Sequence, residues 1–270
     1  MRTLSIFALL VPLLSQHLAI QHRPEEIPAN PSSKPLARRL VGVDPLTLYR
    51  DLMSSSKDER TRSLRRLGDN FSEIDQPEDT RLYALNLDSD PDLEYVLEAK
   101  VAFAATIAWV FKKGPEGWWM VGTFNYSWHW DPNQAERFIE FREIVTYGRK
   151  EIIVRDTGGG TGLAATRLTI YRMNNGFLYR VFETTEDSVS NVVGSGMTEY
   201  EHRDIEYPDP NGADGHTFLI VRLRKHLEDG PDHKKPEIRA CSAFSWDAVF
   251  FRFAEDKAAA ATVCKKQATR

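Results

Sequence analysis

One stretch of this chain occurs twice, and the repetition limits the folds that the sequence can adopt. Residues 104–112 (AATIAWVFK) align with residues 164–172 (AATRLTIYR) at an offset of 60. Both stretches are rich in β-forming residues, and each leads into a turn sequence, at 114–117 (GPEG) or at 174–176 (NNG). A further β-forming run follows each turn. The pattern therefore predicts two equivalent antiparallel hairpins.

The similarity extends upstream of the hairpins. Residues 86–94 (NLDSDPDLE) precede the apolar run YVL, and residues 143–151 (EIVTYGRKE) precede IIV, at an offset of 57. A third, weaker copy begins near 202–206 and continues into 217–224 (TFLIVRLR). We expect a mainly β fold, α+β overall, with two or three antiparallel β-meanders over residues 80–256.

A small helical hairpin is expected before the β region, over residues 44–68. Asp44 followed by Pro45 is typical of a helix start, and Ser56 with Glu59 forms a capping box for a second helix that Gly68 ends. The apolar residues expected to face inward are Leu46, Leu48, Tyr49, Leu52, Leu64 and Leu67. The pair resembles one hairpin of a HEAT-type solenoid. Because a single hairpin cannot bury its own apolar face, we expect it to dock on the β region.

The first 43 residues contain two segments that we expect to lie outside the fold. A basic start and the apolar run at 4–14 (LSIFALLVPLL) are typical of a secretory signal peptide, which we place at residues 1–19. An uncleaved membrane anchor is the alternative. Residues 20–43 carry four prolines without apolar periodicity, which predicts a disordered linker. Since no later run is long enough to span a bilayer, we expect a secreted or periplasmic protein without a stable membrane span after signal cleavage.

Charge and cysteine content restrict the classes of binding partner and the cellular compartments that are compatible with the chain. The chain has 35 basic and 39 acidic residues, a net charge of -4, which gives no electrostatic indication of binding to nucleic acid or to an anionic membrane. Its two cysteines are Cys241 and Cys264. They would form a disulfide in an oxidising compartment and remain free thiols in a reducing one. Residues 257–270 are expected to form a C-terminal tail.

The acidic turn at residues 86–94 resembles the calcium loop of FG-GAP or VCBS-type repeats, the blades of integrin-like β-propellers. Asn86, Asp88, Asp90 and Glu94 stand at the first, third, fifth and ninth places of that loop. The resemblance covers roughly residues 80–226. It implies propeller-blade-like meanders and weak calcium binding by these four residues, since calcium prefers six to eight oxygen ligands.

Some positions of the two loops depart from the family pattern. Pro91 and Ser89 stand where the family has glycine, and proline cannot adopt a positive φ. In the second copy, Val145 and Tyr147 replace ligand positions, so we expect that loop to be metal-free. The alternative for the first loop is a solvated turn whose aspartates cap local backbone groups without a metal.

A glycine run is the first of two candidate ligand-binding segments outside the acidic loop. Gly158, Gly159 and Gly160 lie between two β runs, which favours a hairpin or an exposed binding loop. A phosphate-binding loop is the alternative, but such a loop ends in Lys and Ser or Thr and opens a helix.

An aromatic segment is the second candidate. In an extended chain Tyr126, Trp128 and Trp130 share a face with Phe124. Such a face could stack on sugar rings or receive a partner protein, and packing within the core is the alternative.

Motifs of common hydrolases are missing from the sequence. It has no GxSxG, HExxH or CxxC pattern, and its histidines lack metal-ligand spacing. Glu136, Glu140 and Glu143 resemble paired acids, but neighbours in sequence do not define a glycosidase pair. The sequence therefore favours an exported, non-catalytic binding or scaffolding protein whose ligand is a protein or a glycan. A secreted carbohydrate-acting hydrolase is the alternative, and the expected cofactor is weakly bound calcium or none.

Overall fold

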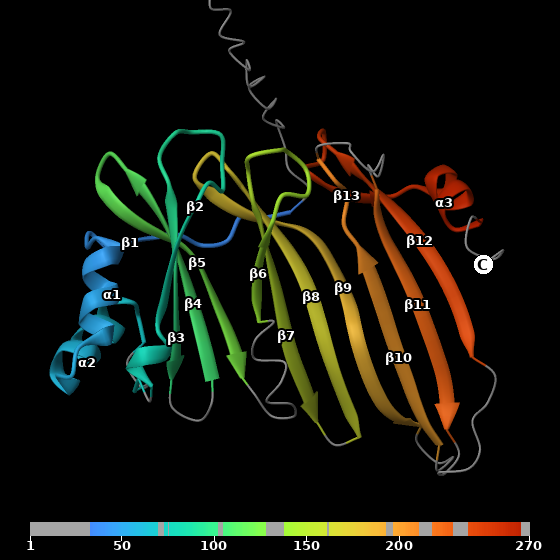
Figure 1. Cartoon of the computed structure of the whole chain (residues 1–270), viewed down its shortest axis with the longest axis horizontal. Coiled ribbons are helices and arrows are strands. Elements are labelled where there is room, and N and C mark those ends of the chain that lie inside the picture. The colour runs from blue at the N-terminus through green and yellow to red at the C-terminus, as the bar shows by residue number, and fades with distance from the viewer. Residues whose placement is uncertain are drawn as a thin grey trace, which may run out of the picture.

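The computed structural model describes residues 33–69, 73–74, 76–101, 105–127, 138–160, 162–192, 197–210, 218–228 and 237–265. Within these ranges the chain is mainly β, with two antiparallel sheets and three short α-helices, which confirms the predicted fold class (Figure 1). The signal peptide expected at 1–19 lies outside the described residues. No helix among those described is long and apolar enough to cross a membrane.

The first sheet has five strands in the order β1-β5-β4-β3-β2. Their bounds are Arg39–Leu40 for β1, Arg81–Leu85 for β2, Glu94–Val101 for β3, Ala105–Gly114 for β4 and Gly117–Ser127 for β5. Helices α1 (Pro45–Met53) and α2 (Lys57–Arg66) pack at one end of the molecule, beside this sheet (Figure 1). A short 3-10 turn, Pro77–Asp79, precedes β2.

The second sheet has eight strands in the order β13-β12-β11-β10-β9-β8-β7-β6. Their bounds are Ile139–Arg142 (β6), Glu151–Gly160 (β7), Leu163–Asn174 (β8), Phe177–Val192 (β9), Met197–Glu206 (β10), Leu219–Glu228 (β11), Ile238–Asp247 (β12) and Arg252–Glu255 (β13). Helix α3 (Lys257–Val263) lies beside β12, at the far end from α1 and α2 (Figure 1).

The strands β2 to β5 and β6 to β9 form two meanders with matching irregularities. The pairing of β4 with β5 shifts register after Val110, and that of β8 with β9 shifts after Ile170, again at an offset of 60. The β8–β9 pairing also shifts after Thr166, where no shift is recorded between β4 and β5. A bulge bends and twists a strand, so both hairpins are bent at the same place. The repeated stretches therefore lie in equivalent positions of the two meanders.

Three apolar clusters hold these layers together. The first lies between the two sheets and includes Val96, Val110, Val121, Phe124, Ile152, Met173 and Leu178. The second joins α1 and α2 to the outer face of the first sheet, through Leu48, Leu52, Leu64, Leu97, Trp109 and Phe111. The third packs β7 to β9 against β11 to β13, through Ile153, Ile170, Val181, Phe182, Leu219 and Phe253. Burial of these side chains supplies the main driving force for stacking the meanders.

The helical hairpin begins and ends close to the predicted residues. The Asp44 carboxylate accepts a hydrogen bond from the Leu46 amide at 3.0 Å, and Gly68 has a φ of +88° just beyond α2. Leu48 and Leu52 are buried as expected, but Leu46 is 38% exposed. The prediction for Leu46 was wrong because residues two apart point to different sides of a helix.

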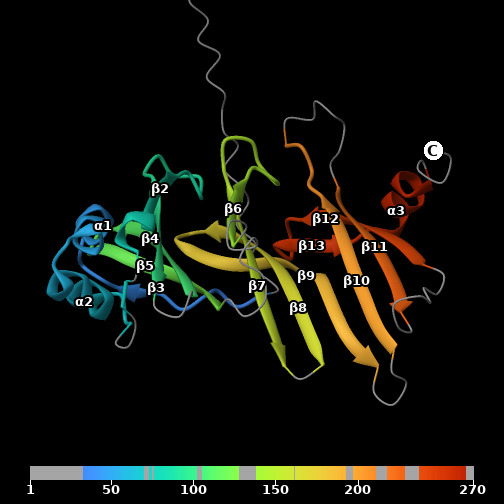
Figure 2. The same cartoon turned by 60° about the horizontal axis from the view of Figure 1, so that its bottom comes forward.

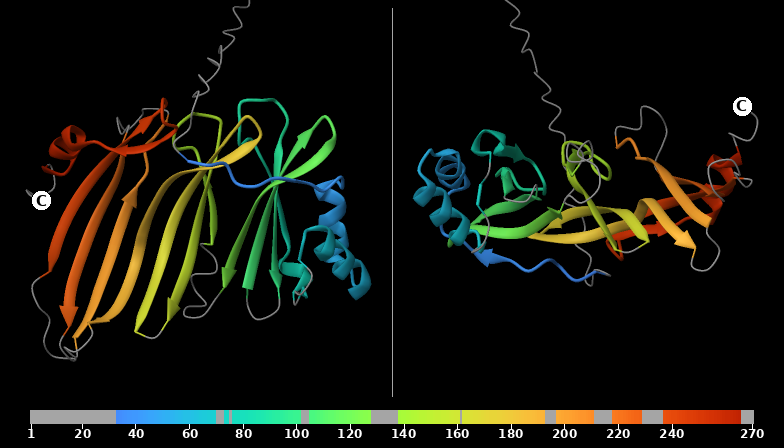
Figure 3. Two further views of the ribbon diagram at one scale, coloured as in Figure 1. Left: turned by 180° about the vertical axis from the view of Figure 1, so that it is seen from behind. Right: turned by 90° about the horizontal axis from the view of Figure 1, so that it is seen from below.

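Residues 33–43 differ from the linker that the sequence predicts for 20–43. They form a strap across both sheets, seen from behind in Figure 3 (left). The Leu36 amide donates to the Leu178 carbonyl at 2.8 Å, and the Val41 amide donates to the Trp118 carbonyl at 2.8 Å. Pro35 is the one proline of this strap, and an extended edge segment tolerates it because one side of its backbone needs no partner.

The outer half of the second sheet forms a single layer. No residue of β10 is buried, nor any described residue of 184–191 in β9, 222–228 in β11 or 238–242 in β12. No described helix or strand covers either face of this region in Figures 1 and 2. Cross-strand ion pairs link its strands instead, such as Lys225 with Glu199 at 2.9 Å and Arg224 with Asp204 at 3.0 Å.

Candidate ligand-binding site

A cavity of about 560 Å³ is lined by residues of both meanders. The turns that contribute to it lie along the upper edge of the sheets in Figure 1. Four segments supply its walls: the strap, the acidic turn of the first meander, the β4–β5 hairpin and the β8–β9 turn. The polar and aromatic residues of the lining include Arg38, Ser89, Asp90, Lys112, Lys113, Glu116, Trp119 and Asn175. A cavity of this size is typical of sites for small ligands.

Lys112 stands at the centre of an acidic cage. Its ammonium nitrogen lies 2.7 Å from Asp88, 2.6 Å from Asp90 and 2.8 Å from Glu94. Burial alone would lower the pKa of Lys112, but the hydrogen bonds to these three carboxylates outweigh it and raise the pKa. Burial raises the pKa of Glu94, whose side chain is fully buried. The ammonium therefore stays charged and neutralises part of the cage.

Glu94 also holds the acidic turn in place. Its second carboxylate oxygen accepts a hydrogen bond from the Leu87 amide at 2.7 Å. The second meander repeats this contact, since Glu151 accepts from the Ile144 amide at 2.8 Å. Glu151 in turn pairs with Arg172, and both side chains are fully buried. Each meander thus buries one glutamate that binds its own upstream turn and a cation from the next strand.

The two upstream turns contact each other directly. Arg149 donates from Nε to the Leu87 carbonyl at 2.9 Å, and the Lys150 amide donates to the Asn86 carbonyl at 2.9 Å. A Cβ on Gly176 would lie 3.5 Å from the Lys112 side chain, so the β8–β9 turn is in contact range of the cage. These contacts fix the cavity walls relative to one another.

Arg38 brings a positive charge to the cavity from the strap. Its guanidinium carbon lies 4.6 Å from the Trp119 ring centroid and 4.2 Å from that of Phe177, which are cation–π distances. Among the described residues it has no hydrogen-bonding or ionic partner. The strap, bonded to both sheets, places this arginine at the junction of the two meanders.

The predicted metal ligands are only partly brought together. Ligand atoms of Asp88, Asp90 and Glu94 lie within 4.8 Å of one another. The backbone carbonyl of Asn86 accepts a hydrogen bond from the Lys150 amide. Asp88 accepts from the Asp90 amide at 3.0 Å, a turn contact of the kind expected in the metal-free alternative. However, Asp88 is 6% exposed, so the turn is not solvated at that point.

The predicted glycines are not among the residues that line the cavity. Gly158, Gly159 and Gly160 belong to strand β7 and pair with β8, so the glycine run forms strand rather than loop. A Cβ on Gly159 would lie 2.7 Å from the Leu163 carbonyl oxygen, which explains the need for glycine there. Tyr126 lies in β5, but its side chain, Trp128 and Trp130 are outside the described residues.

The acids considered for hydrolysis have structural partners. Glu140 pairs with Arg142 and, at 3.2 Å, with Arg155. Glu143 accepts from the Gly148 amide at 3.0 Å. Glu136 lies outside the described residues. Neither Glu140 nor Glu143 lines the cavity.

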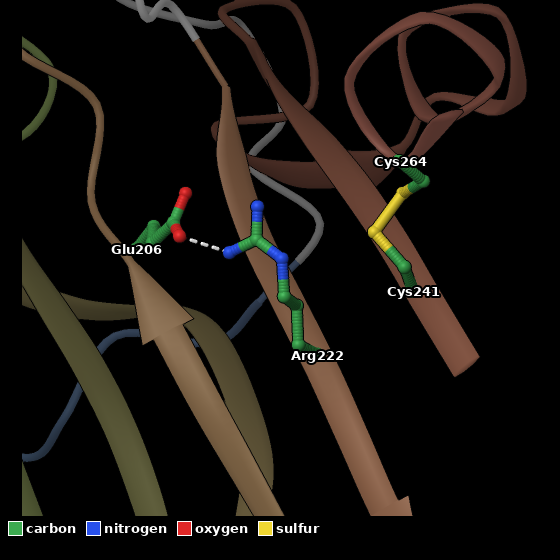
Figure 4. Close-up of a disulfide and its surroundings, with 4 residues drawn as sticks. All are labelled: Glu206, Arg222, Cys241 and Cys264. Atoms are coloured by element: carbon green, nitrogen blue, oxygen red, sulfur yellow. Dashed lines mark hydrogen bonds and ion pairs between the residues drawn. A yellow bond between two sulfur atoms is a disulfide. The ribbon is translucent and has the colours of Figure 1, made fainter. Parts of the chain in front are cut away.

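The C-terminal helix is tied to the sheet by the two cysteines. Cys241 in β12 and Cys264 after α3 are joined by a disulfide with a Cα–Cα distance of 5.8 Å (Figure 4). On the neighbouring strands Arg222 pairs with Glu206 (Figure 4). The predicted tail at 257–270 therefore contains a helix anchored to the sheet.

Sequence reasoning missed Arg38 and Trp119. Arg38 lies in a segment whose prolines suggested disorder, and Trp119 belongs to the aromatic-rich run at 118–130 but not to the face that was predicted to bind a ligand. Their proximity depends on strand pairing across about 80 residues of chain, which composition does not reveal. No protein-family model, curated protein or solved structure matches this chain.

Proposed function

We propose that this chain is an exported, non-catalytic binding protein whose ligand, carried by a protein or a glycan, enters the cavity between the two meanders. The observation that carries this proposal is the convergence of four separate chain segments on one cavity, with Arg38 unpaired among the described residues. Polar groups converging on a concave site are typical of ligand recognition.

Two features support the non-catalytic part of the proposal. The acids of the cage hold Lys112 and backbone amides, and the acids considered for hydrolysis bind arginine or backbone. General acid catalysis needs a carboxyl group that can reach a substrate and exchange its proton. These contacts assign the same carboxyl groups to stabilising the fold.

Export is supported by the sequence at residues 1–19 and by the disulfide between Cys241 and Cys264. Disulfides persist in oxidising compartments, so a secreted or periplasmic location is consistent with this bond. The matching bulges and the repeated glutamate contacts support a stack of blade-like meanders, as the FG-GAP or VCBS resemblance implies.

The test uses a variant that fills the cavity. Ser89 lines the cavity and is exposed, whereas Leu93 is an exposed residue of the same loop outside the lining. A panel of oligosaccharides and peptides would be screened by ligand-observed NMR against the native protein, S89W and L93W. We expect at least one class to bind the native protein and L93W but not S89W. Binding that S89W leaves unchanged would contradict the proposal.

A further inference from the structure

The guanidinium of Arg38 is the group of the cavity that most restricts the class of ligand. Its guanidinium is planar and carries five N–H donors, a geometry that matches a carboxylate. Two aromatic rings at 4.6 Å and 4.2 Å hold the group, and the strap that carries it is hydrogen-bonded on both sides. A donor fixed in this way loses less side-chain entropy on binding an anion.

Lys112 is not available for the same task. Its ammonium already contacts three carboxylates at 2.6–2.8 Å and is mostly buried. Lys113 lines the cavity, is exposed, and has no ionic partner among the described residues. The cavity thus offers two positive groups, Arg38 and Lys113, to an incoming anion.

The remaining polar wall presents acceptors. Each carboxylate oxygen of Asp90 already accepts one hydrogen bond, from Lys112 or from the Asp92 amide, but the side chain is 45% exposed and a carboxylate oxygen can accept a second. Glu116 is exposed at the tip of the β4–β5 hairpin. Their negative charge disfavours a ligand with several charges, such as a phosphate ester, but accepts hydrogen bonds from hydroxyl groups. The amide side chain of Asn175 can donate and accept in the same cavity.

From these observations we infer that the cavity binds an acidic sugar, a uronate whose carboxylate pairs with Arg38 while its hydroxyl groups donate to Asp90 and Glu116. This inference rests on the proposed function and names the ligand class for the same site. A sugar supplies several hydroxyl donors beside one carboxylate, which fits the acidic wall better than a peptide C-terminus with a single nearby N–H.

The experiment compares charged and neutral forms of one ligand on the unaltered protein. Isothermal titration would use galacturonic acid, which carries one carboxylate, and its methyl ester. We expect the free acid to bind and the ester to bind about tenfold more weakly or worse, because the ester loses a charge-assisted hydrogen bond. Equal binding of both forms, or no binding of the free acid, would overturn the inference.

Variants at Arg38 provide a second readout. R38K keeps the positive charge but loses the paired N–H donors of the guanidinium. We therefore expect about tenfold weaker binding of the free acid and little change for the ester. R252K is the matched control, because Arg252 also stacks on a ring, Phe250 at 5.5 Å, but does not line the cavity. Equal loss in R252K would contradict the assignment of Arg38.

The outcomes separate the ligand class from the proposed function. If a neutral oligosaccharide or a peptide from the panel binds and S89W blocks it, while galacturonic acid does not bind, the acidic-sugar inference falls and the cavity remains a binding site. If S89W blocks nothing that binds, both proposals fail.

Discussion

Lys112 and Glu94 face each other on adjacent strands, with the ammonium nitrogen 2.8 Å from a carboxylate oxygen. Arg172 and Glu151 stand in the same relation in the second meander. In both, the glutamate also accepts a hydrogen bond from a backbone amide seven residues upstream. The repeated unit is therefore a buried ion pair that fastens a turn, and the turn of the first meander forms a cavity wall.

Removing the cation from the first pair should destabilise the fold. In K112M the carboxylate of Glu94 would remain buried without its counter-ion, so we expect a loss of about 3–5 kcal/mol in the free energy of unfolding. Urea denaturation measures this loss. K113M is the matched control, since Lys113 is exposed, and should change stability by less than about 1 kcal/mol. Equal effects of the two variants would contradict the cage.

The sequence predicts weak calcium binding by Asn86, Asp88, Asp90 and Glu94, and the position of Lys112 argues against it in the native protein. A calcium ion would have to displace the ammonium from the oxygens that it contacts. We therefore expect the melting temperature of the native protein to be the same in millimolar calcium and in chelator, and that of K112M to rise with calcium. A calcium-dependent rise in the native protein would show that the ion competes with Lys112.

Removing the cation from the buried Glu151–Arg172 pair of the second meander should destabilise the fold to a similar extent. R172M removes the ion pair of the buried Glu151, which keeps its hydrogen bonds from backbone amides and the nearby charge of Arg149. We expect a loss of about 3–5 kcal/mol in unfolding free energy. Arg180 pairs with Glu183 at 2.5 Å but is 55% exposed, so R180M should cost less than about 1 kcal/mol. Chemical denaturation of both variants would check this difference, and a similar cost for the two would count against it.

The stability of the single-layer region should depend on pH through the protonation of His202. Burial alone would lower the pKa of His202, but its bonds to Asp187 at 2.5 Å and Asp204 at 3.1 Å outweigh burial and raise the pKa. A raised pKa means that the stabilisation is complete below the unfolded value, near 6.5, and is lost as pH rises through the folded value. Urea midpoints between about pH 5 and pH 9 should fall across this window in the native protein but not in H202Q.

Reduction of the disulfide should weaken the C-terminal region. Cys241 and Cys264 are 23 residues apart, and closing a loop of this size stabilises a fold by about 3 kcal/mol in the chain-entropy description. The double variant C241A/C264A should therefore unfold at lower denaturant than the native protein. Adding reductant should lower the denaturation midpoint of the native protein and leave that of the double variant unchanged. A lower midpoint in both proteins would point to another cause.

The local features of the fold could be predicted because their signals lie within a few residues. Asp44 and Ser56 cap the two helices as expected, and the turns at 114–117 and 174–176 connect strands as expected. The strap at 33–43 could not be predicted, because its order comes from pairing with Trp118 and Leu178 far along the chain. The single layer of β9 to β12 was also missed, since its alternation of polar residues resembles any half-buried sheet.

The candidate site was only partly visible in the sequence. The spacing of Asp88, Asp90 and Glu94 correctly indicated that their carboxylates converge. Nothing in that spacing showed that Lys112, on a later strand, would lie among them, because strand register decides this contact. The free arginine of the site came from a segment without periodicity, so only the assembled sheets bring it to the cavity.

Chemical-shift mapping tests most directly whether the cavity between the meanders is the ligand site. Labelled protein would be titrated with galacturonic acid while backbone amide and tryptophan indole signals are followed. We predict the largest shifts at Ser89, Gly114, Trp119 and Gly176, all residues of the cavity lining. Shifts gathered on β10 and β11, with none at these positions, would contradict the placement of the site.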